Sequence, residues 1–136
     1  MRPAPATKAG TKPEERLYDA LRRLHLTDFE KQPGDVAGRP DAYFRHTKPR
    51  PVAVYVDGCF FHGCPVPGHF RPSADVGGPR AHRLTREGAA MQRLTDSRIR
   101  RALTAAGTLV LAFWEHDVNA DPDRCAAVIA AAVKAG

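Results

Sequence analysis

The residues of this chain that are best suited to metal binding or catalysis lie between positions 57 and 64. Two thiols and an imidazole fall within six residues, directly after a carboxylate and an apolar run at 52–56. A hydrophobic core requires none of these polar groups at such a position. A structural zinc site beside a hydrolytic centre would require all of them.

A zinc site is the first chemistry that this spacing predicts. Structural zinc takes four N or S ligands in a tetrahedron, commonly two from one loop and two from elsewhere. Cys59, Cys64 and His69 supply three ligands. His116 is the best fourth candidate, because it follows a late apolar strand whose end would approach the thiols if it pairs with the strand before Cys59. The alternative is two unrelated buried cysteines and two surface histidines.

Carboxylates near the same segment predict a magnesium site. Mg²⁺ takes oxygen ligands from one or two carboxylates, together with waters and phosphate oxygens. Asp41 begins a short expected strand and Val56-Asp57 ends the next, so adjacent strands would bring these oxygens together. A turn residue, a cap or a solvated charge is the alternative for each carboxylate. His62 can take a proton from an attacking water, or it serves as a zinc ligand or structural histidine.

Aromatic and basic side chains around this segment are typical of contacts with DNA. Phe60 and Phe61 either fill the core or form a wedge that unstacks a base step. Arginines crowd the region 80–101, where they form either a solvated helix face or a set of phosphate contacts. The arginines predicted to contact DNA are Arg83, Arg86, Arg93 and Arg98. We interpret the remaining candidates as structural: His25, His46, His82 and Cys125.

The composition fits one globular domain with a polyanionic partner. The chain has 136 residues, and 21 Lys and Arg against 15 Asp and Glu give a net charge of +6. Such an excess favours DNA or RNA as a partner, although a plain basic protein shares it. Three cysteines, two of them close together, fit a reducing cytoplasm better than a disulfide framework. We expect no membrane span and no signal peptide, because no long apolar run is present.

The elements that must position these residues follow from turn signals and periodicity. We expect a flexible basic arm at 1–12 and one domain at 13–136, with an irregular stretch at 58–82. The expected order is α, β, β, β, α, β, α, which predicts a sheet covered by helices. Helices are expected at about 13–25, at 83–106 and from Asp121-Pro122, and strands at 42–44, 52–57 and 108–113. The residues expected to face inward from the three helices are Leu17, Ala20, Leu21 and Leu24; Met91, Thr95, Ile99, Ala102, Leu103 and Ala106; and Cys125, Val128, Ile129, Ala132 and Val133.

The segment at 56–65 (VDGCFFHGCP) resembles the signature of the very short patch repair (Vsr) endonucleases. Shorter pieces at 11–14, 38–41 and 105–116 resemble the same family in the same order, so the resemblance covers about 11–118. That family is similar in fold to restriction endonucleases. The resemblance therefore implies an α/β fold with a restriction-endonuclease-like mixed central sheet flanked by helices, and a structural zinc site.

The resemblance also implies roles for individual residues. It makes Asp41 the main Mg²⁺-binding carboxylate, assisted by the backbone carbonyl of Val56. It makes His62 the base or orienter of the attacking water, with Glu14 in support and Asp57 near the scissile phosphate. The residues that match the family's structural zinc are Cys59, Cys64, His69 and His116, and those that match its DNA-wedging aromatic pair are Phe60 and Phe61.

The expected activity is Mg²⁺-dependent nicking of one strand of double-stranded DNA at a T:G mismatch, by a monomeric cytoplasmic repair enzyme. The chain departs from the family where a Trp and an Asn-x-x-Arg-Asp run usually follow the thiols, since only Asp96 of that run remains. One alternative is therefore a Vsr-like nickase without mismatch specificity, working with defence or mobile-element proteins. Another alternative is a zinc-stabilised DNA-binding module without catalysis.

Overall fold

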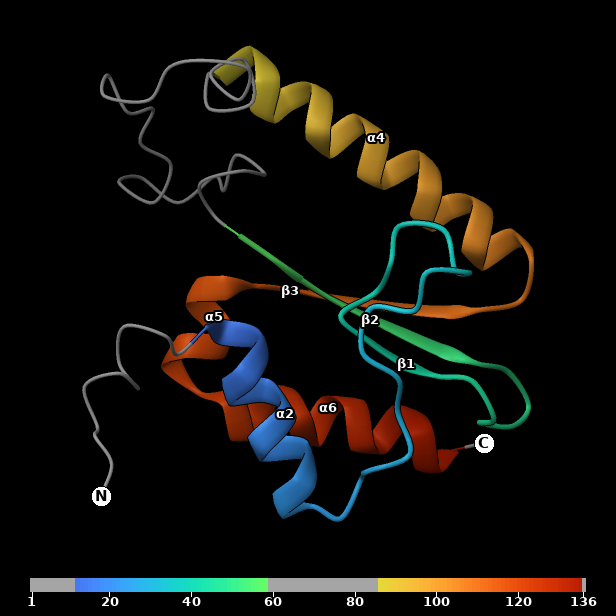
Figure 1. Cartoon of the computed structure of the whole chain (residues 1–136), viewed down its shortest axis with the longest axis vertical. Coiled ribbons are helices and arrows are strands. Elements are labelled where there is room, and N and C mark those ends of the chain that lie inside the picture. The colour runs from blue at the N-terminus through green and yellow to red at the C-terminus, as the bar shows by residue number, and fades with distance from the viewer. Residues whose placement is uncertain (1–11, 59–85, 136) are drawn as a thin grey trace.

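A small mixed sheet lies at the centre of the computed structural model, which describes residues 12–58 and 86–135. The strands are β1 (Ala42–Phe44), β2 (Val52–Asp57) and β3 (Leu109–Trp114), in the order β1-β2-β3. β2 pairs antiparallel with β1 and parallel with β3. Figure 1 shows α4 over one face of this sheet and α2, α5 and α6 over the other, so the predicted sheet covered by helices is confirmed.

The first helix, α2 (Pro13–Arg23), has the sequence signals of a well-formed helix start. Pro13 stands at the first helical position, and Glu14 and Glu15 lie in the first turn, where carboxylates favour the helix dipole. The helix buries Leu17, Tyr18, Ala20 and Leu21. Leu24 was also expected to face inward, but the helix ends one residue earlier and Leu24 is 39% exposed.

The C-terminal helices complete the core beneath the sheet. α5 (Glu115–Ala120) buries Val118, and α6 (Pro122–Ala135) buries Ala126 and Ile129 against α2 and β2. The Oδ1 of Asp121 accepts a hydrogen bond from the backbone N–H of Arg124 at 3.0 Å, so it caps the first turn of α6.

The predicted inward face of α6 is only partly right. Cys125 and Ile129 are buried, but Val128 is 45% exposed, and Ala126 and Ala130 are buried instead. The buried face of α6 is therefore formed by Cys125, Ala126, Ile129 and Ala130, and Val128 lies outside it. Alanines fit there because α2 packs closely against this face.

The long helix α4 (Arg86–Ala105) covers the other face of the sheet. Gly107, at φ +100, ends this part of the chain in a backbone conformation that favours glycine. Leu103 packs against the buried cluster that contains Ala53 and Tyr55, whereas Met91 is 56% exposed. The inward face predicted for α4 was wrong for its more exposed members, which are Met91, Thr95, Ala102 and Ala106.

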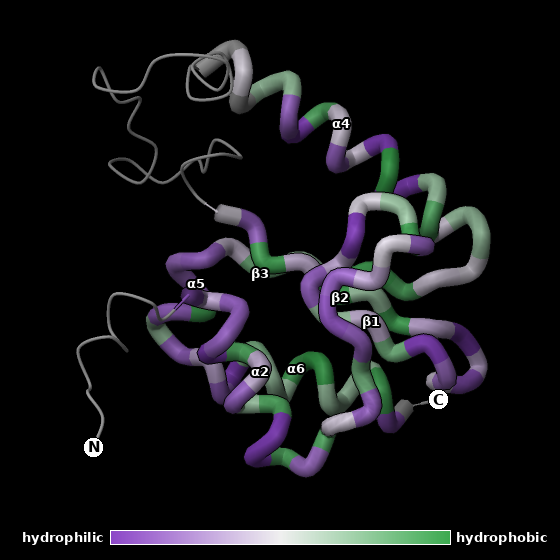
Figure 2. The backbone as a smooth tube through the Cα atoms, in the orientation of Figure 1, coloured by the Kyte–Doolittle hydropathy of each residue, from purple (hydrophilic) through white to green (hydrophobic). Residues whose placement is uncertain are grey.

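The N-terminal half of α4 projects past the sheet, which explains the exposure of Met91 and Thr95 (Figure 1). Hydrophilic and hydrophobic segments alternate along the helix in Figure 2, whereas α6 is hydrophobic over most of its length. No helix in the described ranges combines the length and the apolar character that a membrane span requires.

The element order differs from the prediction in two places. The described residues contain two strands before α4 rather than three, and α5 was not predicted. Glu30 pairs with Tyr43 as a single bridge instead of extending into a further strand. The arm expected at 1–12 and the irregular stretch expected at 58–82 lie almost wholly outside the described residues.

Candidate active site

A tight turn immediately before Asp41 positions this residue at the edge of the sheet. Gly38 and Arg39 have φ of +78 and +45, and the Arg39 N–H bonds the Val36 carbonyl at 3.0 Å. Arg45 ties the start of this loop, because its guanidinium contacts both Glu30 at 2.6 Å and Asp35 at 3.0 Å.

A second contact fixes the backbone of Asp41 from the side of α2. The hydroxyl of Tyr18 donates to the carbonyl of Asp41 at 2.6 Å. Glu14 lies one helical turn before Tyr18 on the same helix. The turn and the helix together hold Asp41 where β1 begins.

The carboxylate of Asp41 lies against the peptide of Val56. Its Oδ2 accepts a hydrogen bond from the Val56 N–H at 2.7 Å, and its Oδ1 lies 3.4 Å from Nε2 of Gln32. Burial raises the pKa of Asp41 to about 6, although the hydrogen bond from Val56 acts in the opposite direction. The negative charges of Glu14 and Asp57 contribute to this rise in the pKa. Asp41, Val56 and Asp57 thus line one cavity, and Glu14 acts on Asp41 through its charge.

Asp57 is also bound to a cation, because it forms a largely buried ion pair with Arg100. The two carboxylate oxygens accept from the guanidinium at 2.6 and 2.9 Å. The side chains of Asp57 and Arg100 are 12% and 19% exposed. The guanidinium also lies 4.3 Å from the centre of the Tyr55 ring. This pair joins the end of β2 to the middle of α4.

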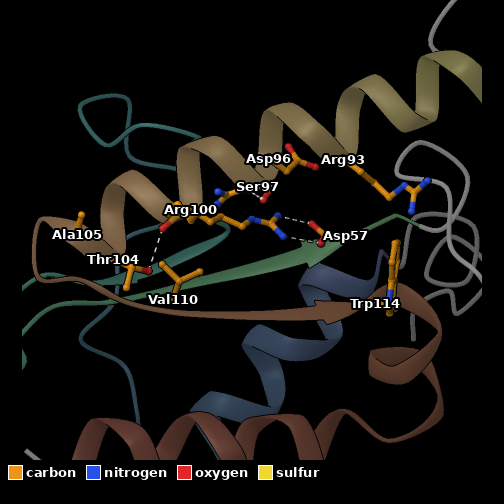
Figure 3. Close-up of a pocket in the computed structure, with 10 residues that line it drawn as sticks. Asp57, Arg93, Asp96, Ser97, Arg100, Thr104, Ala105, Val110 and Trp114 are labelled. Carbon is orange, nitrogen blue, oxygen red and sulfur yellow. Dashed lines mark hydrogen bonds and ion pairs between the residues drawn. The ribbon is translucent and has the colours of Figure 1, made fainter.

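Two hollows meet at the ion pair. The first, which we call the Asp41 cavity, has a volume of about 240 Å³ and is lined by Arg39, Asp41, Val56, Asp57 and Arg100 among others. The second, the α4–β3 groove, has a volume of about 820 Å³. Its lining includes Arg93 and Trp114 (Figure 3), together with Arg101. Asp57, Asp96 and Arg100 line both hollows.

The donor set of the Asp41 cavity fits a hard divalent cation. Its lining offers the carboxylates of Asp41 and Asp57, which are the kind of oxygen ligand that Mg²⁺ prefers. In the described ranges no group of three or more His, Cys, Asp or Glu is arranged to hold a metal ion. A cation here would therefore rest on one or two carboxylates plus waters and phosphate oxygens.

The register of β2 and β3 bears on the predicted zinc site. Asp57 pairs with Trp114 in a parallel ladder, so the chain leaves both strands at one edge of the sheet. His116 comes two residues after Trp114, and Cys59 comes two residues after Asp57. The ring of His116 stacks on Trp114 with 6.5 Å between ring centres, and its Nε2 lies 3.4 Å from Asp117 Oδ1.

The other predicted site residues divide into two groups. Arg93 and Arg98 are exposed on α4, with Arg93 in the groove, and Arg86 is the first residue of that helix. The rest lie outside the described residues: Cys59, Phe60, Phe61, His62, Cys64, His69 and Arg83.

Sequence reasoning gave no individual role to four residues that shape the site. They are Tyr18, Gln32, Arg39 and Arg100. The spacing of Tyr18, one helical turn after Glu14 and next to the apolar Leu17, was a usable signal. Arg100 stood in the recognised basic run, but its partner is 43 residues away, so no local pattern reveals the pair.

Gly38→Ala is expected to destabilise the fold by about 2 kcal/mol and to slow any activity that depends on Asp41. A Cβ at Gly38 would lie 2.9 Å from Cγ2 of Ile99 and 3.0 Å from the hydroxyl of Tyr55, at a φ of +78. Gly34→Ala is the matched control in the same loop, since nothing lies within 4 Å of its added Cβ. Urea unfolding of both variants tests this, and equal midpoints would contradict the strain argument.

Comparison with known proteins decides the family. The family model described as DNA mismatch endonuclease Vsr matches residues 4–66. The Type II nicking enzyme V.NmeDIP of Neisseria meningitidis serogroup C is 34% identical over 125 residues, which cover 92% of this chain and 78% of that protein. The chain belongs to the Vsr endonuclease family.

A second relative agrees with this assignment. The Type II nicking enzyme V.NaeI of Lentzea aerocolonigenes is 36% identical over 116 residues, or 81% of this chain. The matched part spans 63% of that enzyme's length. No solved structure matches the chain. The family resemblance predicted from residues 56–65 is thus confirmed, and the chain is a member of a family of DNA endonucleases.

Proposed function

We propose that this Vsr-family chain is an Mg²⁺-dependent DNA endonuclease that nicks one strand of duplex DNA. The observation that carries the proposal is the Asp41 carboxylate, held against Val56 at 2.7 Å on a cavity with a second carboxylate, Asp57. The names of both relatives, Type II nicking enzymes, support the same activity. We assign the chain a restriction-endonuclease-like fold, of which the mixed sheet and its flanking helices form the described part.

In this proposal Asp41 holds Mg²⁺ together with the carbonyl of Val56. Bound Mg²⁺ supplies polarisation of the phosphate and stabilises the leaving oxygen. Glu14 adds negative charge that favours a cation beside Asp41, consistent with its effect on the pKa of Asp41. His62 takes the proton of the attacking water, and Asp57 lies near the scissile phosphate. Phe60 and Phe61 wedge between bases, and Arg83, Arg86, Arg93 and Arg98 contact phosphates.

The proposal includes a structural zinc bound by Cys59, Cys64, His69 and His116. The parallel register of β2 and β3 supports it, because it brings the start of the Cys59 segment and the His116 helix to one edge of the sheet. The zinc would hold the segment that carries His62 close to Asp41. We further propose that the protein acts as a monomer in the cytoplasm, with residues 1–12 as a flexible arm before a single domain.

Two kinds of duplex DNA are candidate substrates for this site. Mismatched DNA follows from the family description, DNA mismatch endonuclease, and the resemblance at 56–65 makes a T:G mismatch in very short patch repair the expected form of it. Nicking of fully paired DNA is the alternative, and it is favoured by the departure from the family's Trp and Asn-x-x-Arg-Asp run, of which only Asp96 remains. In that case the protein would serve a defence or mobile-element system.

A strand-specific nicking assay on matched and T:G mismatched duplexes tests the proposal. With Mg²⁺ we expect one labelled strand to be cut and the other to stay intact, and without Mg²⁺ no product. Preference for the mismatched duplex assigns repair, and equal cutting assigns the mismatch-independent nickase. DNA binding without product under any divalent metal would make the chain a non-catalytic binding module.

A further inference from the structure

Arg100 occupies the point where the two hollows of the site meet. It lines both the Asp41 cavity and the α4–β3 groove, and Figure 3 shows it in the groove. Its side chain is 19% exposed, so the guanidinium is largely shielded from water yet reaches both spaces. The positive charge of Arg100 therefore lies between the groove, where a DNA strand would bind, and Asp41, where a metal ion would bind.

The guanidinium is held in one orientation by two contacts. Nη1 and Nη2 each donate to one oxygen of Asp57, at 2.9 and 2.6 Å. The face of the guanidinium lies over the ring of Tyr55, 4.3 Å from its centre, and the Tyr55 hydroxyl donates to the Ala37 carbonyl at 3.2 Å. These contacts restrict rotation of the Arg100 side chain, so little of its freedom remains to be lost on binding a ligand.

The ion pair uses only part of the donor capacity of Arg100. A guanidinium carries five N–H donors, and Asp57 takes one from each terminal nitrogen. Among the described residues Asp57 is the hydrogen-bond acceptor of Arg100, while the negative charge of Asp96 also acts on the guanidinium. The fork that includes Nε–H is therefore left to hydrogen-bond a second oxyanion. Phosphate matches such a fork in geometry and charge.

We propose that Arg100 is a phosphate-binding residue of this site, oriented by Asp57 and Tyr55, and that it contacts a phosphodiester beside the Asp41 cavity. The inference rests on the proposed function and deepens it. It gives Asp57 the role of positioning Arg100. The competing explanation is a purely structural ion pair that attaches α4 to the sheet.

Salt-dependent DNA binding separates the two explanations. Binding of a labelled duplex is measured by fluorescence anisotropy at several KCl concentrations, without added divalent metal. Arg100→Ala is expected to raise Kd about tenfold and to lower the slope of log K against log salt by about one, as the loss of one phosphate contact predicts. Arg100→Lys is expected to keep the slope. A structural ion pair would leave the slope unchanged.

Single-turnover nicking provides the second measurement. At saturating DNA, Arg100→Ala is expected to nick about 100-fold more slowly and Arg100→Lys about tenfold more slowly, since lysine keeps the charge but not the planar fork. Arg23→Ala is the matched control: Arg23 pairs with Asp123 at 2.7 Å on the other side of the sheet, and its loss should change neither rate nor slope.

Each outcome decides the proposal. An unchanged salt slope in Arg100→Ala overturns it, whatever the melting temperature of the variant. If Arg100→Ala does not fold, Arg100→Lys decides: slower nicking at an unchanged melting temperature supports the proposal, and wild-type nicking overturns it. If the unmutated protein binds DNA without nicking, the proposed function fails separately, and the slope still decides the role of Arg100. If it binds no DNA, both fail.

Discussion

Asp41→Asn is expected to lower the single-turnover nicking rate by at least about 1000-fold while duplex binding stays within about threefold. The amide keeps the shape of the carboxylate but not its negative charge. Asp41 is the carboxylate held against Val56 at 2.7 Å, whereas both oxygens of Asp57, on the same cavity, already accept from Arg100. Phosphate contacts from arginines are left intact, which is why binding should survive.

The matched control is Asp28→Asn, which removes an exposed carboxylate from the loop between α2 and β1. This variant should nick at the rate of the unmutated protein, because Asp28 does not line the Asp41 cavity. Nicking by Asp41→Asn at more than about a tenth of the normal rate would remove Asp41 from the proposed metal site.

Asp41→Asn is also expected to make the protein more stable at neutral pH. The pKa of Asp41 is raised by burial from 3.8 to about 6, so its charged form is disfavoured in the folded state. The stability that protonated Asp41 contributes is complete below pH 3.8 and is lost as the pH rises through about 6. The asparagine variant avoids this loss. Partial solvent access reduces the gain to about 1–2 kcal/mol, or a few degrees in melting temperature.

Melting curves at several pH values check this second effect. The difference between Asp41→Asn and the unmutated protein should be small near pH 4 and reach its full size above about pH 6. Mg²⁺ should reduce the difference above about pH 6, because a bound cation stabilises only the carboxylate form. Reduced stability of the variant at pH 7 would show that the hydrogen bond from Val56 outweighs the burial of the charge.

Local patterns were sufficient to predict most of the elements around the site. The strand expected at 52–57 is β2, because its apolar run is bounded by Pro51 and Gly58. Proline and glycine likewise marked the start of α2 and the chain reversal at Gly107. These signals act through backbone geometry within a few residues, so they can be read without the tertiary structure.

The contacts that join distant segments were not predictable in this way. The Asp57–Arg100 pair spans 43 residues, and the Tyr18–Asp41 hydrogen bond spans 23. The inward face of α4 was misjudged because periodicity alone does not show where the sheet beneath a helix ends. Sequence reasoning therefore found Asp41 and Asp57 as candidates but not the groups that hold them.

The purified protein is expected to contain one zinc ion per chain, and its removal is expected to lower the melting temperature by more than about 10 °C. Zinc ligands that come from separate segments cross-link the fold, so their release frees the segment that carries Cys59 and Cys64. The parallel pairing of Asp57 with Trp114 is what makes His116 the expected partner of those thiols. Elemental analysis of Cys64→Ser and His116→Ala, which should both lose zinc, tests the assignment.

Cys125→Ala is the control that separates zinc binding from thiol loss. Cys125 is buried in the core with Ala126 and Ile129, and burial raises its thiol pKa, which favours the neutral form over a metal-binding thiolate. This variant should keep its zinc and lose only a little stability. His62→Ala addresses the remaining ambiguity in the ligand set. If it keeps zinc and loses nicking, His62 acts on the water; if it loses zinc while His116→Ala retains it, His62 is the fourth ligand, and another group must act as the base.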